Sequence, residues 1–191
     1  MVLLFSFRSS VADWYYVPTG SMEPTIQVGD RVVVDKSAYT LELPFTDVVV
    51  AKTGNINRGD IVIIDSNAAE TRLIKRVVAI EGDKVKLENN VLFINGEKAT
   101  VSAKDHNLYS EEILGQTRTI ALNPLPSPAK NFNLVTVPRD HVLAMGDNRN
   151  NSVDSRYYGF IPIEEIQGKA NAVAFSLDPD DMYLPRKDRL F

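Results

Sequence analysis

The stretch RLIKRVVAI, Arg72 to Ile80, decides the fold class of this chain. It is rich in β-branched residues, and successive side chains of a strand point to opposite faces. One face would carry Leu73, Lys75, Val77 and Ala79, and the other Ile74, Arg76, Val78 and Ile80. We therefore predict a strand here, with the amine of Lys75 on a largely apolar face.

Short runs of the same kind recur along the chain. They are bounded by Gly, Asp or Asn and read DRVVVDK (30–36), GDIVIID (59–65), DKVKLENNVLFING (83–96) and HVLAMGD (141–147). Gly-Asp pairs precede strand-like runs at 29–30, 59–60 and 82–83, as expected where glycine supplies a positive φ. Asn95-Gly96 is a two-residue hairpin signal, and PIEEIQG (162–168) is the one short helical turn. The pattern predicts a mainly β fold.

The middle of the chain has a different residue pattern. From about Lys98 to Asn133 the β-rich runs become sparse, and NPLPSPAKNFN (123–133) has three prolines in eleven residues, which break a central strand. We predict that residues 84–133 form a smaller inserted subdomain. Residues 1–83 and 134–191 would then pair with each other and form the core.

Composition excludes several classes of protein and site. A chain of 191 residues with 44% hydrophobic content can bury a core. The formal net charge of -4 leaves no excess of Lys and Arg to neutralise phosphates, so we expect no nucleic acid partner. The absence of cysteine excludes disulfides, thiolate nucleophiles and cysteine-rich zinc sites. We expect neither a metal nor a cofactor.

The N-terminal run MVLLFSF is too short to cross a membrane. A spanning helix needs roughly 18 to 20 apolar residues, and this run reaches Arg8 and polar sequence first. It is compatible with the remainder of an anchor, a membrane-touching edge or a first strand. We expect it to make activity depend on detergent or lipid.

The stretch VPTGSMEPT (17–25) holds one serine among turn residues, so Ser21 is either a turn residue or a nucleophile. The two histidines, His106 and His141, are poorly placed in the sequence for a Ser-His-Asp triad. A serine can instead be activated by a lysine whose amine is neutral, and burial lowers a lysine pKa. Lys75 on its apolar face meets that demand, although an edge-strand lysine that prevents aggregation is the alternative.

A third stretch, MGDNRNNSVDSRYYGFIP (145–162), concentrates acids, arginines, amides and hydroxyls beside an apolar strand. A calcium loop counted from Asp147 fails, because Ser152 and Tyr158 stand where Gly and an acid are required. The composition instead indicates a hydrogen-bonded shell that supports a functional site.

The three stretches together resemble, in order and spacing, the sequence boxes of bacterial type I signal peptidases, the serine–lysine leader peptidases. The boxes are GSMEPT, then RGDIVII followed by LIKRVVAIEGDKV, and MGDNRNNSVDSRYYGFIP. The resemblance covers roughly residues 11–177 and is weakest from about 86 to 133. It implies a β catalytic core with an inserted smaller β-rich subdomain. It also implies a serine endopeptidase that removes signal peptides from exported preproteins.

By motif position, the resemblance implies a role for each matching residue. Ser21 is the nucleophile, Lys75 is the general base, and Thr19 assists the backbone N–H of Ser21 in the oxyanion hole. Ser152 matches the serine that orients the lysine. The supporting charged network is matched by Asp147, Asp154, Arg156 and Arg76.

Signal-peptide cleavage sites carry small residues in an A-x-A-like pattern, so the enzyme needs shallow apolar pockets. Leu73 stands where the family often has an aromatic residue, so the pocket wall is expected to differ. Ordinary core packing is the alternative interpretation of the apolar residues placed near the site. The pocket candidates are Val17, Met22, Ile26 and Ile74.

The family usually carries membrane helices before the serine box, whereas twenty residues precede Ser21. We therefore expect the anchor to be absent or truncated in this chain. The resemblance implies action at the outer, periplasmic face of the bacterial cytoplasmic membrane, with signal peptides and the membrane surface as partners.

Two alternatives remain open from the sequence. The first is a related serine–lysine peptidase for a specialised substrate, such as a self-cleaving repressor, although the segment before Ser21 is too short for a DNA-binding module. The second is a relative that binds signal peptides or membranes without cutting them. Such a relative would be expected to have lost Ser21 or Lys75, and both are present.

Overall fold

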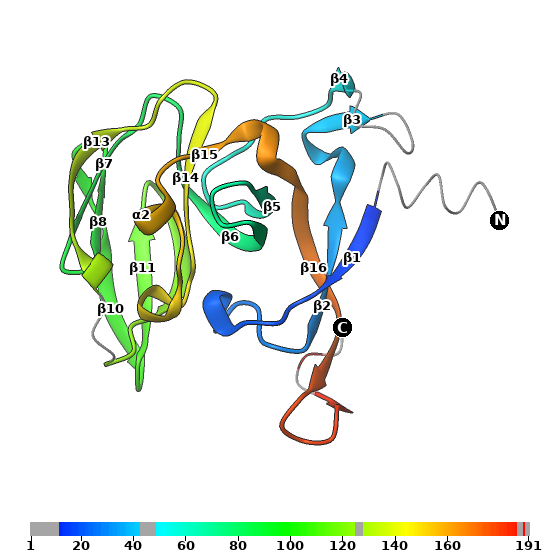
Figure 1. Ribbon diagram of the computed structural model, residues 1–191. Helices are drawn as coiled ribbons and strands as arrows, with labels where there is room; N and C mark the ends of the chain where they lie inside the picture. Colours follow the sequence, from blue (N-terminus) through cyan, green and yellow to red (C-terminus); the bar gives the residue numbers. More distant parts are fainter. Residues whose placement is uncertain (1–11, 43–48, 125–127, 187–188, 190–191) are drawn as a thin grey trace.

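A computed structural model describes residues 12–42, 49–124, 128–186 and 189, and the MVLLFSF run lies outside these residues (Figure 1). The fold is mainly β, as predicted. An eight-stranded antiparallel sheet forms its centre. Its order is β1 (Ala12–Tyr16), β2 (Asp30–Asp35), β16 (Ile166–Asp178), β5 (Ile61–Ser66), β6 (Thr71–Ile80), β14 (His141–Met145) and β15 (Ile161–Pro162), and β17 (Leu184–Pro185) pairs with β16.

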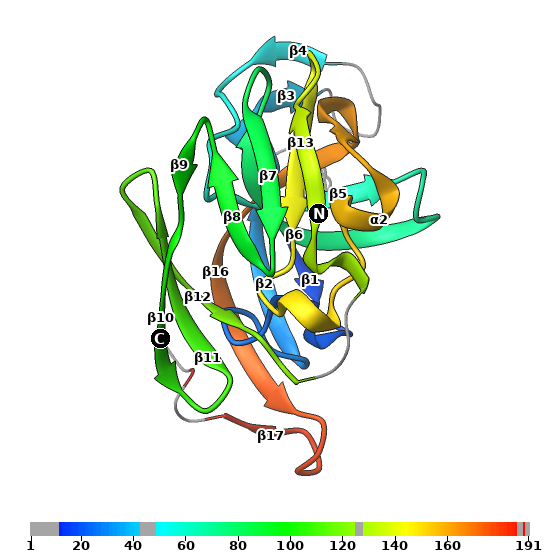
Figure 2. The same ribbon diagram turned by 90° about the vertical axis from the view of Figure 1, so that its left-hand side faces the viewer.

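Three smaller sheets complete the architecture of the described residues. One has the order β13 (Phe132–Thr136), β7 (Lys84–Glu88), β8 (Val91–Ile94) and β9 (Glu97–Lys98). A second contains β10 (Thr100–Asp105), β11 (Leu108–Ile113) and β12 (Gln116–Ala121), and a third pairs β3 (Thr40–Glu42) with β4 (Val49–Lys52). The first two lie together on the side of the large sheet that faces the viewer in Figure 2. The predicted division at residues 84–133 stays a prediction, and β13 crosses its second boundary to pair with β7.

Helical structure is brief in the part of the chain that the structure describes. The α-helix α2 covers Ser155–Tyr158, and single 3-10 turns cover Gly20–Met22, Lys36–Ala38, Pro128–Lys130, Arg149–Asn151 and Ile163–Glu165. The predicted helical turn at 162–168 is therefore right for its first half only, because β16 already begins at Ile166.

The predicted turns are confirmed. Gly29, Gly59 and Gly82 have φ values of 93°, 90° and 83°. At the hairpin of β8 and β9, Asn95 and Gly96 have φ values of 53° and 87°, and Ile94 pairs with Glu97. Both residues are in the left-handed region, which gives the hairpin the twist of its strands.

The strand predicted from RLIKRVVAI is β6, and it pairs with β5 and β14. A bulge interrupts the pairing with β14, because Ala79 lies opposite Leu143 and Val77 lies opposite Ala144. Val77 packs with Val62 and Ile64, whereas Ala79 packs in the core cluster on the β7 side. The prediction that Ala79 shares the face of Leu73 and Val77 is wrong, since the extra residue reverses the alternation.

Two parts of the fold differ from the sequence expectation. The region from Lys98 to Asn133, where strands were expected to be sparse, contains β10, β11 and β12. The longest strand among the described residues, β16 with 13 residues, was not predicted at all. It pairs on one side with β2, which follows the loop of Ser21, and on the other with β5. The strand β5 pairs in turn with β6, which carries Lys75.

Candidate active site

Ser21 lies in the 3-10 turn Gly20–Met22, in the loop between β1 and β2. Met22 and Ile26 follow it and are 1% and 3% exposed, and they form a core cluster with Val17 and Val32. Ile26 N–H donates to the Met22 carbonyl at 3.0 Å. Apolar packing of these residues thus fixes the loop in the core, while Ser21 itself remains partly exposed.

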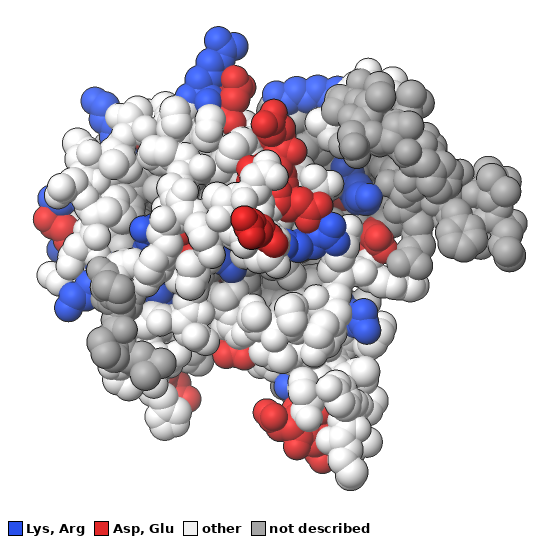
Figure 3. Space-filling view, in the orientation of Figure 1, with Lys and Arg blue, Asp and Glu red and all other residues white. Residues whose placement is uncertain are grey.

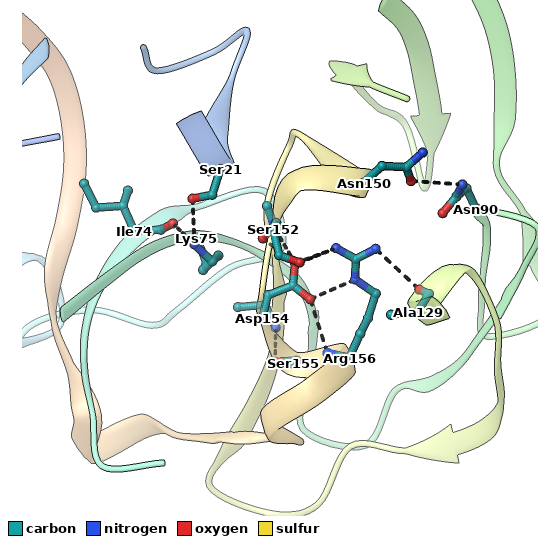
Figure 4. Close-up of polar contacts among 12 residues, drawn as sticks. Ser21, Ile74, Lys75, Asn90, Ala129, Asn150, Ser152, Asp154, Ser155 and Arg156 are labelled. Carbon is teal, nitrogen blue, oxygen red and sulfur yellow. Dashed lines mark hydrogen bonds and ion pairs between the residues drawn. The ribbon is translucent and has the colours of Figure 1, made fainter. Parts of the chain in front are cut away.

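Lys75 reaches Ser21 from the middle of β6. Its Nζ lies 2.8 Å from Ser21 Oγ and 3.0 Å from the carbonyl oxygen of Ile74 (Figure 4). The residue is 3% exposed. Burial lowers the pKa of Lys75 to about 8, with Asp154 and Asp147 opposing the effect and Arg156 adding to it. A neutral amine is therefore accessible near neutral pH, and it can accept the Ser21 hydroxyl proton.

A buried carboxylate, Asp154, organises one side of the site (Figure 4). Arg156 donates to it from Nε and Nη2, each at 2.8 Å, and the Gly146 amide donates at 2.9 Å. The Ser152 hydroxyl donates to Asp154 Oδ2 at 2.7 Å. Burial by itself would raise the pKa of Asp154, but these hydrogen bonds and the Arg156 charge hold it below its usual value.

A second charge pair, Arg76 with Asp147, contacts the serine loop through Thr25. Arg76 donates to both oxygens of Asp147 at 2.8 and 2.6 Å, and its Nη1 donates to the Gly59 carbonyl at 2.8 Å. The Thr25 hydroxyl also donates to Asp147, at 2.5 Å. Arg76 follows Lys75 directly in β6, so Asp147 links the base-bearing strand to the loop of the nucleophile.

Two residues that sequence reasoning missed hold the serine loop against the loop after β14. Asn148 N–H donates to the Ser21 carbonyl at 3.1 Å, and its side-chain amide donates to the Gly20 carbonyl at 3.0 Å. A Cβ on Gly146 would lie 2.3 Å from Ser152 Oγ and 2.4 Å from the Ser21 carbonyl oxygen. Both residues stand inside the quoted third stretch, but its composition did not distinguish them.

A buried ionic cluster ties the same loop to the three-stranded sheet. Glu111 of β11 is 0% exposed and Arg149 is 1% exposed. Arg149 donates to both Glu111 oxygens at 2.7 and 2.6 Å, and Arg118 Nε donates at 2.6 Å. Burial alone would raise the pKa of Glu111, but Arg149 and Arg118 outweigh it and lower the pKa to about 2. No local pattern marked Glu111 in the sequence.

Thr19 and the four apolar pocket candidates lie close to Ser21 in the sequence or pack near its loop. Thr19 is exposed and precedes the 3-10 turn of Ser21, and its hydroxyl does not cap that turn. Val17, Met22 and Ile26 lie in the core, whereas Ile74 is partly buried against them. Direct lining of a substrate pocket stays a prediction for all four apolar residues, and Ile74 is the one with appreciable exposed surface.

Within residues 12–42, 49–124, 128–186 and 189, no group of three or more His, Asp or Glu side chains is arranged to hold a metal ion. The side chains gathered at Ser21 are a hydroxyl, an amine, two carboxylate–guanidinium pairs and an amide. This set is suited to proton transfer from Ser21.

Comparison with known proteins identifies the family. The model of the family described as signal peptidase, peptidase S26, matches residues 1–175. A signal peptidase I of Pseudomonas fluorescens is 32% identical, over all of this chain and 74% of that protein. A probable signal peptidase I-2 of Synechocystis is 32% identical over 89% of this chain and 66% of that protein. Signal peptidase I P of Bacillus subtilis subsp. natto is 31% identical over 93% of this chain and 85% of that protein. The chain belongs to the signal peptidase family, peptidase S26.

Proposed function

We propose that this chain is a serine endopeptidase that removes N-terminal signal peptides from exported preproteins, with Ser21 as nucleophile and Lys75 as general base. The observation that carries the proposal is the 2.8 Å contact between Ser21 Oγ and the amine of a buried lysine. Membership of the signal peptidase family supports the substrate class.

The proposed reaction has two halves. In the first, neutral Lys75 takes the Ser21 proton as Oγ attacks the scissile carbonyl, and the Ser21 N–H and the Thr19 hydroxyl stabilise the oxyanion. The C–N bond then breaks, and Lys75 returns the proton to the leaving amine of the mature protein. In the second half, Lys75 activates a water that hydrolyses the ester between Ser21 and the signal peptide.

The surrounding residues have positioning roles in this proposal. Asp154 and Arg156 fix the segment that carries Ser152, and Ser152 orients the protonated amine of Lys75 through oxygen lone pairs that its bond to Asp154 leaves available. Asp147 and Arg76 fix the serine loop relative to β6. The charges of Asp154 and Arg156 act on the pKa of Lys75 in opposite directions, and burial remains the largest influence on it.

We place this activity at the outer face of the bacterial cytoplasmic membrane. None of the helices in the described part of the chain is long and apolar enough to cross a membrane. An exposed apolar face supports contact with the membrane surface. On β1, Trp14 and Tyr16 are 55% and 40% exposed, and Phe175 of β16 is 41% exposed. Tyr16 and Phe175 both pair with Arg31, so they share one face of the sheet. Trp14 lies two residues before Tyr16 on β1, so its side chain is on the same face.

Cleavage of a preprotein with an A-x-A site tests the function. The purified chain, in detergent or lipid, should release the mature protein, and the Ser21→Ala variant should not. Equal cleavage by both would show that the activity comes from another site. Binding of the signal peptide without cleavage by either would instead identify a non-catalytic relative.

A further inference from the structure

The segment after β16 lies against the loop that carries Ser21. It turns back through the hairpin of β16 and β17, below β2 in Figure 1. Leu177 N–H donates to the Gly29 carbonyl at 3.2 Å, and a Cβ on Gly29 would lie 1.9 Å from the Leu177 carbonyl oxygen. Residues 176–189 follow the residues that the family model matches, 1–175.

Arg186 makes the first side-chain connection between this segment and the serine loop. Its Nη1 donates to the carbonyl of Val28 at 2.8 Å and to Ser176 Oγ at 3.1 Å. The same guanidinium donates to Asp178 at 3.3 and 3.2 Å. Arg186 therefore joins the start of the hairpin, at Ser176 and Asp178, to the carbonyl of Val28 in the serine loop.

Arg189 makes the second connection, and it reaches further toward Ser21. It donates to both oxygens of Asp30, at 3.2 and 2.5 Å, and to the carbonyl of Thr25 at 3.1 Å. Asp30 is 0% exposed and also accepts the Gln27 N–H at 2.9 Å. The guanidinium thus bridges both ends of the segment from Thr25 to Asp30, which has no strand or helix of its own before Asp30.

Thr25 is where two restraints on the loop meet. Its hydroxyl donates to Asp147, which pairs with Arg76 beside the base, and its carbonyl accepts from Arg189. The loop is consequently held between the Lys75 strand on one side and the C-terminal segment on the other. A displacement of about 1 Å in a catalytic group can cost about 100-fold in rate.

We propose that Arg189, assisted by Arg186, is a positioning residue that holds the loop of Ser21 at its working distance from Lys75. This inference rests on the function proposed above. It assigns a kinetic role to Arg189, whose hydrogen bonds are to Asp30 and Thr25 and not to Ser21 or Lys75.

The test compares kcat, KM and thermal midpoint for the full chain and for Arg189→Ala, Arg189→Lys and Arg139→Ala. Arg139 is the matched control because its side chain is 86% exposed and meets Asp140 at 3.5 Å. For Arg189→Ala we expect kcat to fall about tenfold or more, with KM changed less than about twofold and the pH midpoint unchanged, since Lys75 is untouched. Arg189→Lys should recover part of kcat, and Arg139→Ala should equal the full chain.

Loss of Arg189 leaves the buried Asp30 carboxylate unpaired, so the single variant will also lose stability. The double variant Arg189→Ala/Asp30→Asn removes that charge, and it should regain thermal stability while keeping the low kcat. A double variant with the kcat of the full chain would overturn the inference. A fall in thermal midpoint with unchanged kcat per folded molecule in Arg189→Ala would overturn it as well.

The two proposals fail in different ways. If the full chain and Ser21→Ala cut the preprotein equally, the proposed function fails and this inference fails with it. If the full chain shows Ser21-dependent cleavage and Arg189→Ala retains its kcat, the inference alone fails.

Discussion

Lys75 keeps its amine next to Ser21 in a buried position, and that burial determines the pH at which the base is available. The pKa of Lys75 is lowered to about 8. Below that pH the amine is protonated and cannot accept the Ser21 proton, so kcat/KM should rise with pH through a midpoint near 8 and then level off. Lys75→Arg should be nearly inactive at every pH, because arginine does not deprotonate in a protein. A pH–rate profile measures both, and normal turnover by Lys75→Arg would exclude Lys75 as the base.

Thr19 is predicted to stabilise the oxyanion through its hydroxyl. It is exposed beside Ser21, and its side chain does not cap the adjacent 3-10 turn. Thr19→Val keeps the shape and removes the donor, so kcat should fall about 100-fold with KM little changed. Thr19→Ser should restore most of the rate, and the pH midpoint should stay in place. Near-normal kcat in the valine variant would leave Thr19 as a turn residue.

Gly146 is predicted to be required for activity because there is no room for a side chain at this position, and not because its backbone conformation demands glycine. An alanine Cβ would lie 2.3 Å from Ser152 Oγ and 2.4 Å from the Ser21 carbonyl oxygen. Gly146→Ala should therefore push the two loops apart and lower kcat at least tenfold, as expected for a displaced nucleophile. The control is Gly96→Ala, which has φ +87° and open space around its Cβ. It should lose stability but retain kcat, and equal kcat in both variants would contradict the prediction.

At the scale of elements, β11 is coupled to the loop after β14 by Glu111 and Arg149. Removing one partner of a buried ion pair leaves an uncompensated charge, which costs about 3 to 5 kcal/mol. Glu111→Gln should thus lower the free energy of unfolding by about 3 kcal/mol at pH 7. Glu112→Gln, the exposed neighbour in β11, should change it little. Urea unfolding of both variants beside the unaltered chain measures the difference.

The pH dependence of this coupling has a definite sign. The pKa of Glu111 falls from 4.5 to about 2 on folding, so its ionisation stabilises the fold above about pH 4.5. That contribution is lost as the pH falls from about 4.5 to about 2. The gap in stability between the unaltered chain and Glu111→Gln should accordingly narrow at pH 3. A gap that is the same at pH 3 and pH 7 would contradict the assignment.

Elements with strong local patterns were predictable from the sequence. The strands β2, β5 and β6 carry β-branched runs, and each adjoins a turn with a glycine at positive φ, namely Gly29, Gly59 or Gly82. The strand β14 carries a short apolar run bounded by turn residues. The strand β16 was not predicted because its sequence, IQGKANAVAFSLD, contains many small residues. Its pairing with β2 has two register shifts, so its side chains do not alternate regularly between the two faces. The strand β10 has a largely exposed, polar sequence, TVSAKD, without an apolar face to detect.

The same distinction applies to the site. Ser21, Lys75 and Asp154 stand in short stretches of sequence whose residue types and order allowed them to be proposed as site residues. The connections that hold those stretches together join residues far apart in the chain. Arg149 meets Glu111, Asn148 meets Gly20, and Arg189 meets Asp30. These pairs depend on tertiary topology, and a single sequence holds no periodicity that identifies them.

Over the whole molecule, charge gives little reason to expect attraction to an anionic surface. The formal net charge is -4, and Lys and Arg are interspersed with Asp and Glu on the face shown in Figure 3. Asp178, Asp180 and Asp181 gather on the C-terminal hairpin, seen at the bottom of that view. Contact with a membrane would therefore depend mainly on the aromatic side chains on the exposed face of β1 and β16, with Arg31 between Tyr16 and Phe175 as its cationic group.

The aromatic face of β1 and β16 should meet the membrane. Trp14, the single tryptophan of the chain, lies on the exposed face with Tyr16 and Phe175, so its fluorescence reports on this face. Adding zwitterionic vesicles should shift its emission to shorter wavelength and raise the rate of preprotein cleavage, because the apolar side chains enter the interface. Replacing Tyr16 and Phe175 by Ser should weaken both effects. Leu134→Ser, a 63% exposed apolar residue of β13 away from this face, should leave both unchanged. Equal cleavage rates with and without vesicles, with no change in emission, would show that this face does not meet the membrane.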